Sequence, residues 1–97
     1  MVLTSKQRAK LRSLAQAEDS IAQFGKDELS PEQVKMIEDA LAKRELIKCT
    51  ALESSPYTAV ELMNLLAEKT NSIPVTAIGR KFVLFKRNNK KPIIDLK

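Results

Sequence analysis

Three four-residue segments fix where helices can begin in this chain. Thr4–Gln7, Ser30–Gln33 and Thr58–Glu61 each place Ser or Thr three residues before Gln or Glu. In this pattern, the capping box, each side chain accepts a hydrogen bond from the other residue's backbone N–H, so two unpaired donors at a helix N-terminus are satisfied. Pro31 strengthens the second start, because proline suits the first helical position. The sequence therefore predicts three helices, one after each box.

Hydrophobic periodicity predicts where these helices end and where strands lie between them. Helical spacing places Leu3, Leu11 and Leu14 on one side of the first helix, and a stripe of apolar residues runs along each of the others. Gly79-Arg80-Lys81 predicts a tight hairpin between the last two strands. We expect helices over residues 5–17, 31–44 and 59–71, and strands over residues 20–24, 46–52, 73–78 and 82–86.

The resulting order is α-β-α-β-α-β-β. Strands that alternate with helices favour crossover connections and parallel pairing, while the closing hairpin adds an antiparallel pair. We therefore predict an α/β (α+β) fold with a four-stranded mixed sheet and helices packed on it. With 97 residues, the chain fits a single domain, which we place at residues 1–87. Residues 88–97 form a polar C-terminal tail, expected to be loose over residues 88–92, with no docking place assigned to Ile93–Leu96.

Cysteine content and hydropathy favour a cytoplasmic protein. The single Cys49 cannot form a disulfide within the chain, which suits a reducing compartment. No apolar run approaches the roughly 20 residues needed to span a bilayer. The first residues lack the apolar core of a signal peptide. We expect a monomer with no membrane partner.

Charge is segregated along the chain. Residues 1–12 hold four basic side chains and no acid, and residues 79–91 hold six and no acid. Residues 13–78 hold 6 basic and 11 acidic side chains. If the two ends meet in the fold, they form one positive surface that attracts a polyanion.

The turn before the second helix has two interpretations. Gly25 would let a partner approach the backbone, Lys26 adds charge, and the following helix N-terminus presents N–H groups. These features together describe a phosphate-binding turn. The alternative is an ordinary connection from strand to helix.

Enzymatic chemistry is poorly supported. The chain has no His, which removes the usual general base, the partner of a Ser or Cys nucleophile and most zinc sites. No Walker loop or Gly-x-Gly-x-x-Gly motif occurs. With 3 Phe and 1 Tyr, an aromatic stacking platform of the RRM type is not indicated. We predict no catalytic residues, no cofactor and no metal.

Four blocks in order resemble the CRM domain (chloroplast RNA splicing and ribosome maturation), and its free-standing bacterial YhbY-like form in particular. They are Leu3–Arg8, Phe24–Leu29 with its Phe-Gly-Lys-x-x-Leu pattern, Arg44–Lys48 and Ile78–Phe85. The resemblance covers about residues 3–87. It implies a fold like the C-terminal domain of the third bacterial translation initiation factor. It also implies RNA binding and a role in large ribosomal subunit assembly, on ribosomal RNA or a precursor particle.

The family also carries a Gly-x-x-Gly loop, likened to that of KH domains. Its first Gly falls on Gly25 and its variable pair on Lys26 and Asp27. Its second Gly falls on Glu28, where this sequence departs from the family.

The sequence therefore predicts a non-enzymatic RNA-binding protein that works mainly through phosphate contacts. One alternative is a protein-interaction adaptor whose basic surface binds an acidic partner. Another is a DNA-binding protein, although no helix-turn-helix spacing is visible. The candidate RNA-binding residues are Lys6, Arg8, Arg12, Gly25, Lys26, Gly79, Arg80, Lys81, Lys86 and Arg87.

Overall fold

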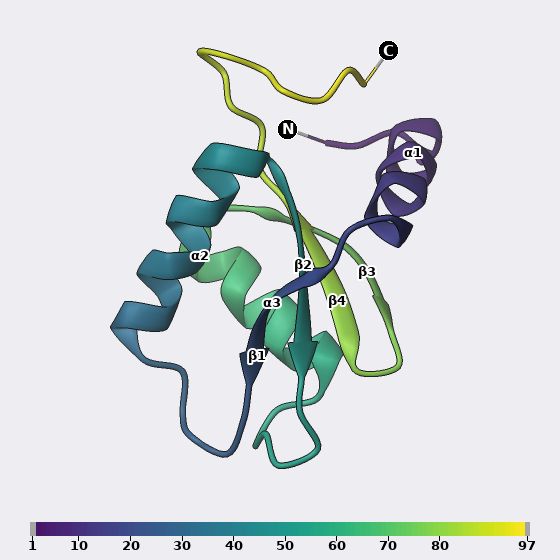
Figure 1. Cartoon of the computed structure of the whole chain (residues 1–97). Coiled ribbons are helices and arrows are strands. Elements are labelled where there is room, and N and C mark those ends of the chain that lie inside the picture. Colours follow the sequence, from purple (N-terminus) through teal and green to yellow (C-terminus); the bar gives the residue numbers. More distant parts are fainter. Residues whose placement is uncertain (1, 97) are drawn as a thin grey trace.

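A computed structural model describes residues 2–96 as three helices and a four-stranded sheet (Figure 1). Met1 and Lys97, the outer ends of the expected domain and tail, lie outside the described residues. The predicted order α-β-α-β-α-β-β is confirmed. The elements are α1 (Ser5–Gln16), β1 (Ser20–Phe24), α2 (Pro31–Arg44), β2 (Leu46–Ala51), α3 (Ala59–Thr70), β3 (Ile73–Ile78) and β4 (Lys81–Phe85).

All three capping boxes form, with both reciprocal hydrogen bonds in each. The backbone N–H groups of Gln7, Gln33 and Glu61 donate to the hydroxyl oxygens of the cap residues at 3.1, 3.2 and 3.1 Å. The helix starts are therefore set by local chemistry, as the sequence predicts.

The strand order in the sheet is β1-β2-β4-β3. Strands β1 and β2 are parallel and joined by α2, whereas β4 is antiparallel to both β2 and β3. The predicted hairpin turn is shorter than expected, because Lys81 pairs with Ile78 and Thr50 as the first residue of β4. The loop is Gly79-Arg80, with a positive φ of 60° at Gly79, as in a type II′ turn.

The two faces of the sheet are covered unequally. Helices α2 and α3 pack on one face and enclose the larger core, which includes Ile37, Leu66 and Phe82. Helix α1 and the end of the C-terminal tail cover part of the other face and form a second, smaller core (Figure 1). Leu11 and Ala15 face this second core, but Leu14, expected beside Leu11, is 39% exposed because the buried side of α1 is centred on Leu11 and Ala15.

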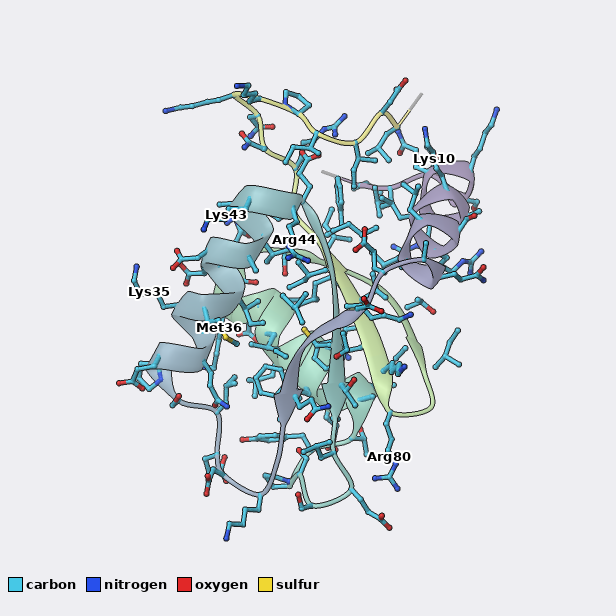
Figure 2. All side chains as sticks on the ribbon, viewed as in Figure 1. Lys10, Lys35, Met36, Lys43, Arg44 and Arg80 are labelled. Carbon is cyan, nitrogen blue, oxygen red and sulfur yellow. The ribbon has the colours of Figure 1, made fainter. Side chains whose placement is uncertain are left out.

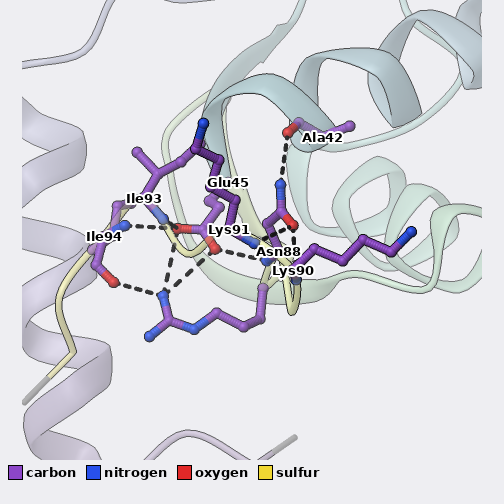
Figure 3. Close-up of polar contacts among 8 residues, drawn as sticks. Ala42, Glu45, Asn88, Lys90, Lys91, Ile93 and Ile94 are labelled. Carbon is purple, nitrogen blue, oxygen red and sulfur yellow. Dashed lines mark hydrogen bonds and ion pairs between the residues drawn. The ribbon is translucent and has the colours of Figure 1, made fainter.

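Residues 88–96 form no helix or strand, but they are fastened to the body by Glu45 (Figure 3). Glu45 follows α2 directly, and its side chain is fully buried. Its carboxylate accepts hydrogen bonds from the backbone N–H groups of Asn88, Ile93 and Ile94 at 2.6, 2.8 and 2.7 Å. Leu96 then packs into the second core. Residues 88–92, which were expected to be loose, are thus held at Asn88 and directly after Pro92 by hydrogen bonds to the same carboxylate.

Burial raises the pKa of the Glu45 carboxyl, but its hydrogen bonds act more strongly in the opposite direction. The backbone donors of Asn88, Ile94 and Ile93, together with the Arg87 charge, bring this pKa below its ordinary value. The Arg87 guanidinium lies 3.4 Å from the carboxylate. The carboxylate is therefore ionised at neutral pH and holds the tail as an anion.

Replacing Glu45 by Gln should destabilise the protein. We expect the free energy of unfolding at pH 7 to fall by about 2–4 kcal/mol, because a buried anion with several donors is lost and Arg87 loses its partner. Urea denaturation measures this difference. Glu38→Gln makes the same chemical change at an exposed position of α2 and should stay within about 0.5 kcal/mol of the natural protein.

The stability difference between the natural protein and Glu45→Gln should also depend on pH. Because the folded pKa of Glu45 lies below the unfolded one, its stabilisation is complete above the ordinary glutamate pKa of about 4.3. It is lost as the pH falls through the folded pKa. The gap in unfolding free energy between the natural protein and Glu45→Gln should therefore narrow between pH 7 and pH 3. A constant gap would contradict this account.

Candidate nucleic-acid interface

The sheet face that carries α1 is open at one end. Leu46 and Phe85 pair across strands beneath α1 and the tail, and both are buried. The cross-strand neighbours Thr50, Lys81 and Ile78 lie at the other end of the same face. Lys81 is exposed and Ile78 is 74% exposed. This end of the face is therefore available to a partner.

Three cations meet where α1 ends above this open region. Arg12 from α1, Lys48 from β2 and Lys81 from β4 line a small cavity of about 60 Å³, and no acidic residue lines it. We call these three residues the basic face. Arg12 and Lys81 come from the two basic stretches of the sequence, and they line this cavity together.

Lys48 was absent from the residues expected at the site. Its ammonium group donates to the backbone carbonyls of Ala15 and Glu18 at 3.1 and 3.4 Å, which ties the end of α1 to the sheet. The sequence did carry a signal for it: Lys48 alternates with the buried Ile47 and Cys49, which places it on the opposite face.

Lys26 and Arg80 lie at the same end of the sheet as the open region. Strands β1 and β2 end together, with Phe24 beside Ala51. The Ala51 N–H donates to the Arg80 carbonyl at 2.7 Å, so the hairpin reaches the same level. The connections after β1, after β2 and between β3 and β4 thus gather at one end of the molecule, where Figure 2 labels Arg80. We call these connections the loop end.

Three of the expected cations are held by the protein itself. The Arg8 guanidinium donates to the carbonyls of Pro74 and Val75 at 2.8 and 2.9 Å. Lys86 donates to the Thr70 carbonyl at the end of α3 at 2.9 Å. Arg87, two residues past the end of β4 and away from the hairpin, donates to the Glu45 carboxylate and to the Ile94 carbonyl. These side chains stabilise the fold, and their hydrogen bonds within the protein leave them less able to bind a partner.

Other expected cations are free to meet a partner. Lys6, Arg12, Lys26 and Lys81 are exposed, and over residues 2–96 none makes a side-chain hydrogen bond or ion pair. Arg80 lies 3.6 Å from Glu53, and both side chains are largely exposed. Such surface pairs contribute little, so a phosphate can replace Glu53.

The turn at Gly25 is held against the connection after β2. Gly25 has no positive φ, and a Cβ added to it would meet Ser54 and Leu52 at ordinary contact distances of 3.6 and 3.7 Å. Glu28, which replaces the family's second Gly, accepts a hydrogen bond from the Tyr57 hydroxyl. This bond, together with burial and nearby acidic charge, raises the pKa of Tyr57. Tyr57 therefore keeps its proton at neutral pH.

Nucleophilic and metal chemistry find little support in the described residues. Cys49 is fully buried, and burial raises its pKa to about 12, so it stays a protonated thiol. Within residues 2–96, no cluster of three His, Cys, Asp or Glu side chains could bind a metal ion. None of the helices in that range has the length and apolar character required to cross a membrane.

Comparison with known proteins identifies the class. Residues 3–86 match the CRS1 / YhbY (CRM) domain, so the chain belongs to this family. It is 34% identical over 95 residues to the "Probable RNA-binding protein YqeI" of Bacillus subtilis (strain 168), covering 98% of this chain and 99% of that protein.

A solved structure supports both fold and family. The solution structure of the hypothetical protein SAV1595 from Staphylococcus aureus, described as a suspected RNA-binding protein, is 38% identical. It superposes with a TM-score of 0.74, covering 97% of this chain and all of that one. The predicted fold and the predicted family are both confirmed.

The two glycines of the loop end should respond differently to alanine. Gly79 has φ +60°, a conformation that costs an L-residue about 1–2 kcal/mol, so Gly79→Ala should lower the free energy of unfolding by that amount. Gly25→Ala should change it by less than about 0.5 kcal/mol, because its φ is ordinary and its surroundings have room. Urea denaturation of both variants tests this, and equal losses would contradict it.

Proposed function

We propose that the protein is a monomeric, cytoplasmic, non-enzymatic RNA-binding module that acts on ribosomal RNA or a precursor of the large ribosomal subunit during its assembly. Membership of the CRS1 / YhbY (CRM) family and the names of the similar proteins support RNA as the partner. The ribosomal target follows from the resemblance to YhbY-like proteins.

The observation that carries the proposal is the basic face. Arg12, Lys48 and Lys81 line one small cavity that no acidic residue lines, and the free cations Lys6 and Lys26 lie on α1 and at the loop end. Phosphate contacts of this kind supply most of the affinity of sequence-independent nucleic-acid binding. They also orient the protein on the backbone without reading bases.

Crosslinking in living cells tests the target. The protein is crosslinked to RNA and purified, and the attached RNA is sequenced. We expect large-subunit ribosomal RNA and its precursors to dominate. Reads spread over messenger and transfer RNA would overturn the assembly role and leave RNA binding intact. Partners that persist after RNase treatment would instead favour an adaptor that binds acidic proteins.

Binding to structured RNA should depend strongly on salt. If about 4–6 phosphates are neutralised, log affinity should fall against log salt with a slope of roughly −3 to −5. Arg12→Gln and Lys81→Gln should each weaken binding for all sequences and make the slope shallower by about 1. Fluorescence anisotropy of a labelled RNA over a salt series measures both quantities.

Lys35→Gln is the matched control, because Lys35 is exposed on α2, on the other side of the sheet (Figure 2). It should leave the slope unchanged. A flat salt dependence in the natural protein, or equal affinity for polyglutamate, would argue against phosphate contacts.

A further inference from the structure

A cavity of about 350 Å³ opens at the loop end, between the start of α3 and the hairpin residues that precede Lys81 of the basic face. Its walls come from the connection after β2, the start of α3 and the hairpin, and they include Leu52, Glu53, Pro56, Tyr57, Gly79 and Arg80. This volume lies at the small end of the range of ligand pockets in proteins. It therefore suits one small, flat group better than a peptide segment.

The side chains around this cavity combine an aromatic surface with a cation. Tyr57 and Pro56 supply apolar walls, and Arg80 stands at the rim with an exposed guanidinium. A guanidinium binds phosphate oxygens through two donors and also stacks on flat rings. The Glu53 carboxylate near Arg80 is 89% exposed, so it can move aside when a phosphate arrives.

Tyr57 is held in place before any ligand binds. Its hydroxyl donates to Glu28, across the gap between two connections. Its backbone N–H donates to the Ser55 hydroxyl at 3.1 Å, and its ring packs partly against the main core. A ring that is already held through its hydroxyl and its backbone loses little conformational entropy when a base stacks on it.

We propose that this cavity binds one unpaired nucleotide of the RNA, with its base against Tyr57 and its phosphate against Arg80. This inference rests on the proposed function and narrows it to RNA with a single-stranded loop, bulge or end next to the segment on the basic face. Unpaired bases are what proteins bind by stacking on aromatic side chains, because bases inside an RNA helix are already stacked.

The chain offers a clean reporter, because Tyr57 is its only tyrosine. Protein made with 3-fluorotyrosine therefore carries one fluorine resonance, which lies in the cavity. We expect a short single-stranded oligoribonucleotide to shift this resonance. The dissociation constant from this titration should equal the one measured by anisotropy. The same sequence closed into a duplex should shift it much less.

Variants then separate stacking from charge. Tyr57→Leu should weaken single-strand binding by about fivefold or more, the lower end of the range for one base stacked on an aromatic ring. Tyr57→Phe, which keeps the ring, should stay close to the natural protein. Arg80→Gln should weaken binding several-fold, whereas Arg44→Gln, the same change at the far end of α2 (Figure 2), should not.

The outcomes are distinguishable. If anisotropy reports RNA binding but the resonance does not move, or if Tyr57→Leu binds as tightly as the natural protein, the cavity proposal is overturned and the proposed function stands. If no RNA binds, both fail. A polyglutamate peptide that shifts the resonance as RNA does would also overturn the proposal, in favour of an acidic protein partner. The fluorine titration needs no substitution, so it decides the question even if Tyr57→Leu does not fold.

Discussion

The carboxylate of Glu45 is the contact on which the arrangement of the chain ends depends. It is fully buried at the junction of α2 and β2, in a residue with φ 63°. The backbone carbonyl of this residue accepts from the N–H of Lys86, and its side chain collects three N–H groups of the tail. An unpaired charge at this depth would be strongly destabilising. The carboxylate therefore requires the tail to return, which brings Leu96 into the second core beside α1.

The same contact helps to divide the cations into two groups with different tasks. Arg87 neutralises Glu45, while Arg8 and Lys86 bind backbone carbonyls of β3 and α3. Cations that bind the protein's own carbonyls and carboxylate order the fold and leave less charge for a partner. Arg12 and Lys81 face solvent at the open end of the sheet, and they remain available for phosphates.

Local chemistry explains why so much of the fold could be predicted. Capping boxes involve four consecutive residues, and hydrophobic alternation involves a single strand, so both can be recognised in the sequence. The role of Glu45 could not be predicted, because its hydrogen-bond donors lie more than 40 residues away in the chain. The candidate site was predictable to a lesser extent. Charge counting selected Arg12 and Lys81 as candidates, whereas Lys48, which lines the same cavity, lies in an acidic region of the chain and was not among them. Counting charge also could not separate Arg8 and Arg87 from cations that remain free.

The hydrogen bonds of Arg8 have a consequence for how the protein behaves at high concentration. Strand β3 is at an edge of the sheet, where unpaired backbone groups invite another chain to add a strand. Pro74 has no N–H to offer there, and Arg8 occupies the carbonyls of Pro74 and Val75 at the irregular point of the strand. A charged side chain thus protects this edge against aggregation, and detachment of α1 from the sheet would expose it.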